Sequence, residues 1–176
     1  PLRHYNGIKF DNATGIAAVS NGIQTEAVFE TYRLLFNVGT SAAKDFMQKL
    51  LDGADAEPDS LHTPRIAGII IPNKGKPVFI IGIKTHDAPA AVSLIAPAAG
   101  KMTGISTYQG NLDNPEPTDP AAPLAELKFD GTTPHDLAKY LYDISAASYK
   151  GDDIRVCSVG GIYSGSSWDV AIVNKY

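Results

Sequence analysis

Two apolar runs, residues 66–71 ("IAGIII") and 78–83 ("VFIIGI"), place the strongest constraint on the fold of this chain. Neither run alternates with polar residues, which is typical of strands that are covered on both faces. The connection between the runs holds Asn73 and Gly75, which favour the tight turn of an antiparallel hairpin. We therefore expect central strands near 66–71 and 78–83 in a mixed β-sheet with antiparallel hairpins, and helices on both faces of that sheet.

Two segments before these strands repeat apolar residues at helical spacing. In the first segment the repeated residues are Val28, Tyr32, Leu35 and Phe36. In the second segment they are Ala43, Phe46, Met47, Leu50 and Leu51. The second segment follows Gly39, has Thr40 or Ser41 as its N-cap, and ends at Gly53, where a C-terminal cap belongs. Both segments are predicted to be helices.

A third helix is predicted for "GTTPHDLAKYLYDI", with Thr133 as N-cap, Pro134 at the first helical position and Asp136 completing a capping box. Strands are expected on either side of the turn at Asn12 and Gly15, and in the closing segments "DIRVCSV" and "WDVAIVN". The segment "DAPAAVSLIAPAAGKM" is ambiguous, because its prolines would flank only a very short helix. The pattern predicts an α+β fold, or an α/β fold, in a single domain over 1–176 with a proline-rich loop at 111–123.

The composition excludes several kinds of partner. The net charge of −4 is spread along the chain without a basic run that could follow a phosphate backbone, so nucleic acid is not expected. No segment approaches the roughly 20 apolar residues that cross a bilayer. The start "PLRHYNGIKF" lacks the pattern of a secretory signal, and a single cysteine indicates no redox compartment, so localisation stays open.

Cys157, the one cysteine, is the clearest candidate nucleophile. We expect it near the end of a strand, before Gly160 and Gly161, whose backbone N–H groups could hold an oxyanion. His86 follows a core strand and is the expected general base, with Asp87 as the carboxylate that orients it. His135, at the start of the third helix, is the reserve base.

The segments "TTPHDLAKYL" and "DIRVCSVGG" resemble parts of the caspase-like cysteine peptidases. The resemblance implies a histidine and a cysteine, each placed after a strand, that form a catalytic pair. The competing interpretation is that Cys157 is a packed thiol, because free cysteine is among the most buried residue types. Of the two, the packed thiol is favoured.

Metal and cofactor signals are weak. His62, His86, Asp87 and His135 could in principle share a metal, but no pair has the spacing that marks zinc ligands. The segment "GGIYSGSS" lacks the lysine of a phosphate loop and the spacing of a dinucleotide site. No cofactor or metal is therefore expected.

Two functional hypotheses remain open at this level. The first is a non-catalytic assembly or interaction subunit, such as a virion, tail or filament component, that binds protein partners or itself. It rests on the low charge content, the proline-rich loop and the lack of a charged constellation. The alternative is a small effector-like cysteine hydrolase or transferase that uses Cys157 with His86. The sequence favours the first.

Overall fold

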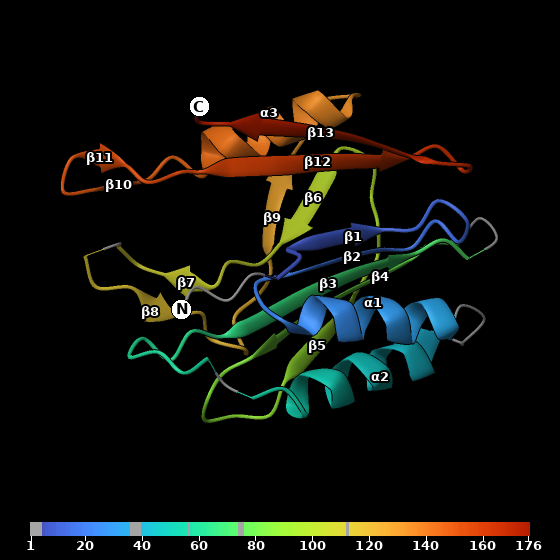
Figure 1. Cartoon of the computed structure of the whole chain (residues 1–176), viewed down its shortest axis with the longest axis horizontal. Coiled ribbons are helices and arrows are strands. Elements are labelled where there is room, and N and C mark those ends of the chain that lie inside the picture. Colours follow the sequence, from blue (N-terminus) through green and yellow to red (C-terminus); the bar gives the residue numbers. More distant parts are fainter. Residues whose placement is uncertain (1–4, 36–39, 56, 74–75, 112) are drawn as a thin grey trace.

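The larger of two β-layers in the molecule is a five-stranded antiparallel sheet. The structure is a computed structural model, which describes residues 5–35, 40–55, 57–73, 76–111 and 113–176. The strands of the sheet follow one another in chain order from β1 to β5 (Figure 1). They are β1 (Ile8–Phe10), β2 (Ala17–Ser20), β3 (Arg65–Ile71), β4 (Val78–Lys84) and β5 (Ala91–Ile95). The predicted apolar runs are thus β3 and β4, and they pair with each other as an antiparallel hairpin.

Helices α1 (Gln24–Leu34) and α2 (Thr40–Asp52) cover one face of this sheet (Figure 1). The core between helices and sheet is apolar and buried, and its largest members are Tyr32, Ile16, Met47, Leu51, Ile80 and Val28. Gly82 on β4 lies directly under α2, where a Cβ atom would overlap Leu51. Glycine at this position therefore lets the helix approach the strand closely.

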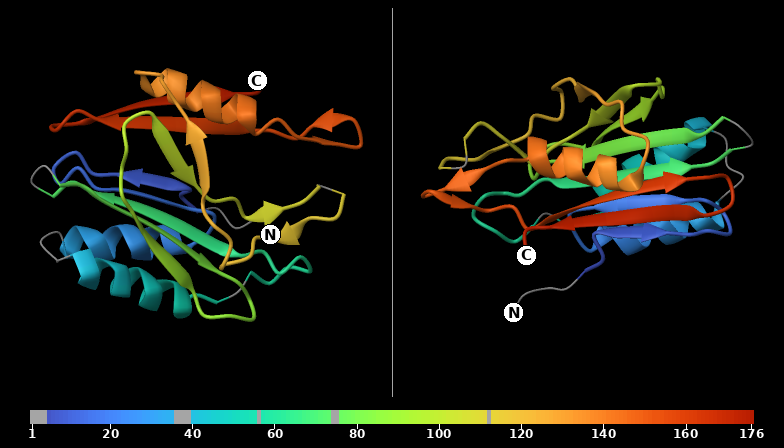
Figure 2. Two further views of the ribbon diagram at one scale, coloured as in Figure 1. Left: turned by 180° about the vertical axis from the view of Figure 1, so that it is seen from behind. Right: turned by 90° about the horizontal axis from the view of Figure 1, so that it is seen from above.

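A second, smaller layer is built from the last quarter of the chain. The hairpin of β12 (Cys157–Tyr163) and β13 (Trp168–Asn174) carries α3 (Pro134–Ile144) on its outer side (Figures 1 and 2). The predicted capping box of α3 is present, with the Thr133 hydroxyl accepting from the backbone N–H of Asp136. Gly160 lies against α3 so closely that a Cβ atom would overlap the carbonyl oxygen of Pro134.

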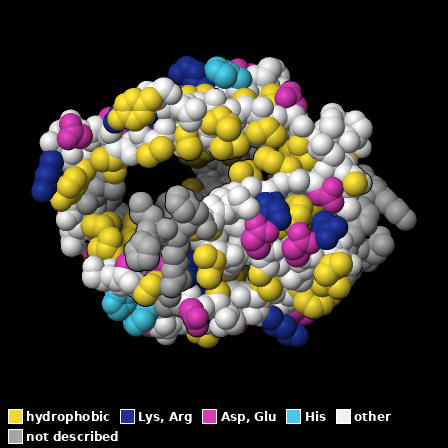
Figure 3. Space-filling model, viewed as in Figure 1, with side chains coloured by type: hydrophobic (Ala, Val, Ile, Leu, Met, Phe, Trp, Pro, Cys, Tyr) yellow, Lys and Arg dark blue, Asp and Glu magenta, His cyan; other side chains and the backbone are white. Residues whose placement is uncertain are grey.

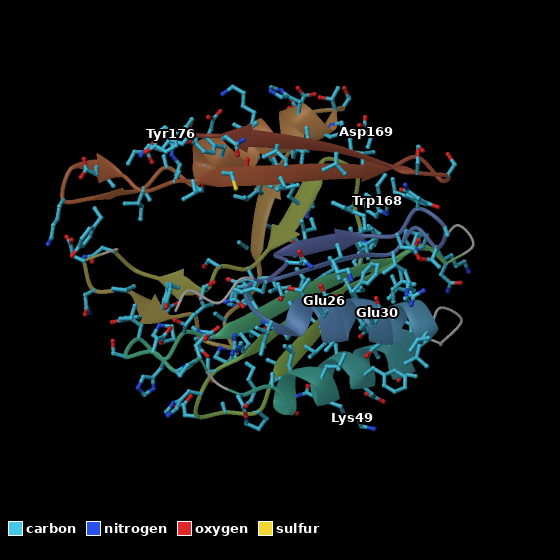
Figure 4. All side chains as sticks on the ribbon, in the orientation of Figure 1. Glu26, Glu30, Lys49, Trp168, Asp169 and Tyr176 are labelled. Atoms are coloured by element: carbon cyan, nitrogen blue, oxygen red, sulfur yellow. The ribbon has the colours of Figure 1, made fainter. Side chains whose placement is uncertain are left out.

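Trp168 joins the two layers at one end of the molecule (Figure 4). Its indole N–H donates to the carbonyl oxygen of Gly15 at 3.1 Å, and its backbone N–H donates to Oδ1 of Asn12 at 2.8 Å. Its ring packs against Phe10 of β1, with 5.1 Å between the ring centroids. The turn between β1 and β2 is therefore the main described contact of the hairpin with the five-stranded sheet.

Short strand pairs connect the layers and extend beyond them. The first pair is β6 (Lys101–Gly104) with β9 (Ala125–Lys128). The others are β7 (Tyr108–Gln109) with β8 (Glu116–Pro117), and β10 (Ser148–Tyr149) with β11 (Asp152–Asp153). The predicted proline-rich loop at 111–123 thus contains the strand β8. None of the helices in the described ranges is long and apolar enough to cross a membrane.

The α+β class is confirmed, but two details of the predicted sheet are wrong. Every strand pairing among the described residues is antiparallel, so the sheet is not mixed. Among the described residues, helices pack on one face of the five-stranded sheet, and the β12–β13 hairpin lies over part of the other face. The ambiguous segment forms strand β5, where residues 91–95 pair with β4. The predicted roles of Phe36, Gly39 and Gly75 lie outside the described residues.

Candidate functional site

The buried polar side chains of the described core gather at one end of the five-stranded sheet. The buried polar and charged residues are Ser20, Gln24, Thr25, Arg65 and Thr85. They stand where β2 ends, α1 begins, β3 begins and β4 ends. Because neighbouring strands are antiparallel, the end of β2, the start of β3 and the end of β4 lie side by side at one end of the sheet. Buried polar groups cost stability unless they are bonded, so this concentration marks a candidate site.

The turn between β2 and α1 is held by its own hydroxyl groups. The Ser20 and Thr25 hydroxyls lie 2.5 Å apart and share a hydrogen bond, in which either can be the donor. The hydroxyl whose proton is not used there donates to the carbonyl oxygen of Gly22, which lies 3.1 Å from Oγ of Ser20 and 3.0 Å from Oγ1 of Thr25. Asn21 fastens this turn to β3, since its Nδ2 donates to the carbonyl oxygen of Pro64 and its Oδ1 accepts from the backbone N–H of Ile66. The sequence "SNGIQT" therefore folds as a rigid entry into α1.

Arg65 is the buried cation of this end, with 3% of its surface exposed. Its guanidinium forms an ion pair with Glu57, and its Nε donates to the carbonyl oxygen of Asp55 at 3.0 Å. A Cβ atom on Gly22 would overlap both Nη1 of Arg65 and Oε1 of Gln24. Oε1 of Gln24 has no hydrogen-bond partner among the described residues. Glycine at position 22 thus leaves room for Arg65 and Gln24 to pack closely together. These two residues, with Asn21, are called the polar floor below.

A second turn, residues 59–63, presents His62 beside this floor. Asp59 accepts hydrogen bonds from the backbone N–H groups of Leu61 and Thr63 and from the Thr63 hydroxyl. These bonds, led by that of the Thr63 hydroxyl, hold the pKa of Asp59 below its usual value. The Thr63 hydroxyl also bonds the phenol of Tyr108 on β7. His62 has a φ of 51°, a left-handed backbone conformation that is uncommon for a residue other than glycine.

A pocket of about 590 Å³ opens beside these turns. Its lining residues are Leu61, His62, Thr85, His86, Asp87, Ala88, Pro117, Thr118, Asp119 and Pro120. The rings of His62 and His86 meet edge to face, with 4.2 Å between their centroids. Histidines are coloured cyan in Figure 3, and side chains of this kind lie at the lower left, at the end of the five-stranded layer. The Oγ1 atom of Thr85 is buried and has no partner among the described residues.

The structure brings together only part of the predicted catalytic set. His86 and Asp87 line the same pocket, and His62 joins them. Cys157 lies in the other layer, at the first position of β12, and does not line the pocket. His135 is on the exposed surface of α3. The pairing of Cys157 with His86 therefore stays a prediction that no described contact supports.

The local prediction for Cys157 is wrong in two respects. Its side chain is exposed, so it is not a packed thiol. It begins its strand instead of ending it, because Gly160 and Gly161 belong to β12 and pair with Ala171 and Val170 of β13. Their place is explained by close packing, against α3 for Gly160 and against the Phe10 ring for Gly161. Within the described ranges, no three metal-ligating side chains converge.

The polar floor is not recognisable from local sequence patterns. Asn21, Gln24 and Arg65 belong to segments more than 40 positions apart that meet only through the pairing of β2 with β3. One signal was available, because Arg65 directly precedes an apolar run that the pattern itself predicts to be buried. A charged residue that is buried at such a position needs an ion-pair or hydrogen-bond partner.

The chain is similar to a known protein family and to several of its members. The family described as IMP cyclohydrolase-like protein matches residues 1–166. The chain is 28% identical to the IMP cyclohydrolase of Haloarcula marismortui, over 99% of this chain and 75% of the relative. It is 26% identical to that of Methanocella arvoryzae, over 99% and 72%. It is 30% identical to that of Natronomonas pharaonis, over 90% and 66%.

These matches correct the functional prediction. The relatives are named as enzymes, so the predicted non-catalytic assembly subunit, and with it a virion, tail or filament setting, is wrong. They support neither the cysteine hydrolase alternative nor the resemblance to caspase-like peptidases. Binding to protein partners or to a second copy stays a prediction. With the family pattern spanning residues 1–166, this chain belongs to the IMP cyclohydrolase-like protein family.

Proposed function

We propose that this protein interconverts inosine monophosphate (IMP) and its ring-opened form, the reaction that the name of its relatives describes. The observation that carries the proposal is the family match over residues 1–166, together with relatives named IMP cyclohydrolase that align with 90% or more of the chain. The polar end of the five-stranded sheet and its pocket offer a place for this chemistry.

The reaction adds or removes one water molecule. In the hydrolytic direction, water adds to C2 of the hypoxanthine ring and the bond between N1 and C2 breaks. This leaves an imidazole nucleotide with a carboxamide and a formamido group. In the closing direction, the carboxamide nitrogen attacks the formyl carbon, and the formyl oxygen leaves as water. Closure therefore requires one group that takes a proton from nitrogen and one that gives a proton to oxygen.

His62 and His86 suit this exchange of protons. The imidazole of histidine can both accept and donate a proton, which makes histidine the most frequent general acid or base in enzymes. The two rings are in contact inside one pocket, and the fixed turn of Asp59 supports one of them. The pocket volume of about 590 Å³ falls within the usual range for small-molecule sites. We assign His86 and His62 as the proton-transferring residues, with Asp87 beside His86.

The test is a closure assay that follows formation of IMP from the ring-opened nucleotide by ultraviolet absorbance. Replacing His86→Asn is expected to lower kcat/KM by about 100-fold, the usual contribution of a positioned acid or base. His135→Asn is the matched control, because this histidine is exposed on α3, and it is expected to leave the rate unchanged. A wild-type chain without activity would contradict the proposed function. Full activity in both His62→Asn and His86→Asn would contradict the assignment of these residues.

A further inference from the structure

The pocket lining has an unusual balance of charge for a nucleotide site. Two carboxylates line it, Asp87 after β4 and Asp119 after β8, while none of the lysines and arginines that the structure describes does so. The nearby Lys84 directs its ammonium group to the backbone, donating to the carbonyl oxygens of Thr85 and Ala88. A phosphate group inside this pocket would face two negative charges without a fixed cation, which disfavours it.

Carboxylates are well suited to a different part of a nucleotide, the ribose. An ionised carboxylate only accepts hydrogen bonds, and neighbouring sugar hydroxyls are donors. Asp119 has one oxygen, Oδ1, occupied by the backbone N–H of Ala121 at 2.8 Å, which fixes the carboxylate and leaves Oδ2 available. The Asp87 carboxylate forms no hydrogen bond with another described residue.

Thr85 supplies an independent observation. Only 7% of its surface is exposed, it lines the pocket, and its hydroxyl has no partner among the described residues. A buried hydroxyl without a partner is costly, and a bound hydroxyl or ring oxygen would relieve that cost. The apolar walls formed by Leu61, Pro117 and Pro120 suit the flat base and the carbon face of the sugar.

Building on the proposed function, we propose that this pocket reads the ribose of its nucleotide, with Asp87 and Asp119 accepting hydrogen bonds from the 2′ and 3′ hydroxyls beside the Thr85 hydroxyl. The phosphate then lies at the mouth of the pocket, away from the carboxylates. The site is thereby specific for ribonucleotides over 2′-deoxyribonucleotides.

The experiment is a calorimetric titration of the full chain with IMP and with 2′-deoxy-IMP. Loss of one charge-assisted hydrogen bond is expected to weaken binding of the deoxy compound by about tenfold or more. Asp119→Asn or Asp87→Asn is expected to weaken IMP and to reduce the preference for ribose to about threefold or less. Asp45→Asn, which changes the same charge on the exposed surface of α2, is expected to keep the full preference.

The outcomes separate the two proposals. Equal binding of IMP and 2′-deoxy-IMP by the wild-type chain would overturn ribose recognition while leaving the proposed function intact. A preference that survives in both aspartate variants, with melting temperatures unchanged, would overturn the roles of Asp87 and Asp119. No binding of IMP at all would overturn the proposed function and this inference together.

Discussion

At the scale of single residues, the most informative atoms are buried polar atoms without partners. Oε1 of Gln24 and Oγ1 of Thr85 are the two such side-chain atoms among the described residues, and both belong to the same end of the five-stranded sheet. In folded proteins most buried polar atoms form hydrogen bonds, so two exceptions at one end of the sheet indicate atoms that a ligand or water could bind. Exposed residues with reactive chemistry, such as Cys157, carry less weight.

Cys157 provides a prediction at this scale. Replacing Cys157→Ser is expected to leave the closure rate unchanged, because the thiol is exposed on β12 and does not line the pocket. The measurement is kcat/KM for IMP formation, beside labelling of the thiol by an alkylating reagent in the native protein. Full alkylation without loss of activity would agree with this. A Cys157→Ser chain with a rate reduced as far as His86→Asn would restore the predicted pair of Cys157 and His86.

At the scale of elements, close approach of helix and strand decides where glycine is needed. Gly160 on β12 lets α3 rest on the hairpin, and Ser158 two positions earlier donates its hydroxyl to the carbonyl oxygen of Ala138 at 2.5 Å. The glycine pair that a sequence pattern associates with a loop is therefore part of a packed strand. Packing, not backbone freedom, explains this glycine, since it is not among the glycines with positive φ.

Replacing Gly160→Ala is expected to destabilise the protein by about 1–3 kcal/mol, because the new methyl group overlaps the α3 backbone and the helix must shift. Gly104→Ala is the matched control, since a Cβ atom there meets no other atom within 4 Å. Its effect is expected to remain within about 0.5 kcal/mol. Both free energies of unfolding come from denaturant titration. Equal stability of the two variants would mean that α3 does not pack on β12 as described.

The sequence predicted elements better than it predicted the site, for a physical reason. Periodicity is local, so α2, α3 and the β3–β4 hairpin could be recognised from their own residues. Segment 91–95 could not, because it becomes a strand only by pairing with β4. His86 and Asp87 were predicted correctly as residues beside a strand end, and Cys157 was predicted to lie near the end of another strand. Cys157 does not meet them, because its strand β12 pairs only with β13 among the described strands.

At the scale of the whole molecule, two layers share few described contacts beyond Trp168 and the β1–β2 turn. In Figure 3 apolar side chains (yellow) border a hollow between the layers. Val170 and Ile172, on the same side of the hairpin as Trp168 by the register, are 40% and 58% exposed. That residues 1–176 form a single domain stays a prediction.

The stability of the protein at low pH is a property of the whole molecule, because ionised carboxylates in both layers stabilise the folded state. Hydrogen bonds hold the pKa values of Asp59, Asp136 and Asp153 below their usual values, and Arg155 is the largest cause for Asp153. A pKa that is lower in the folded state adds stability above the unfolded pKa, near 3.8. That stability is lost as the pH falls through the folded values.

The melting temperature is therefore expected to be constant from neutrality to about pH 5 and to fall below about pH 4. Asp153→Asn is expected to make this fall shallower, because it removes the carboxylate that Arg155 stabilises. Asp169→Asn is the control, since this exposed carboxylate on β13 (Figure 4) makes no ion pair with the described residues. Identical pH profiles for both variants would contradict the role given to Asp153.

Whether the pocket binds the nucleotide is tested by titrating the protein with IMP and observing the imidazole signals of its histidines by nuclear magnetic resonance. IMP is expected to shift the signals of His62 and His86, which line the pocket, and to leave that of His135 on α3 unchanged. Assignment rests on the single His→Asn variants. If saturating IMP moved neither pocket histidine, the polar end of the five-stranded sheet would not be the nucleotide site.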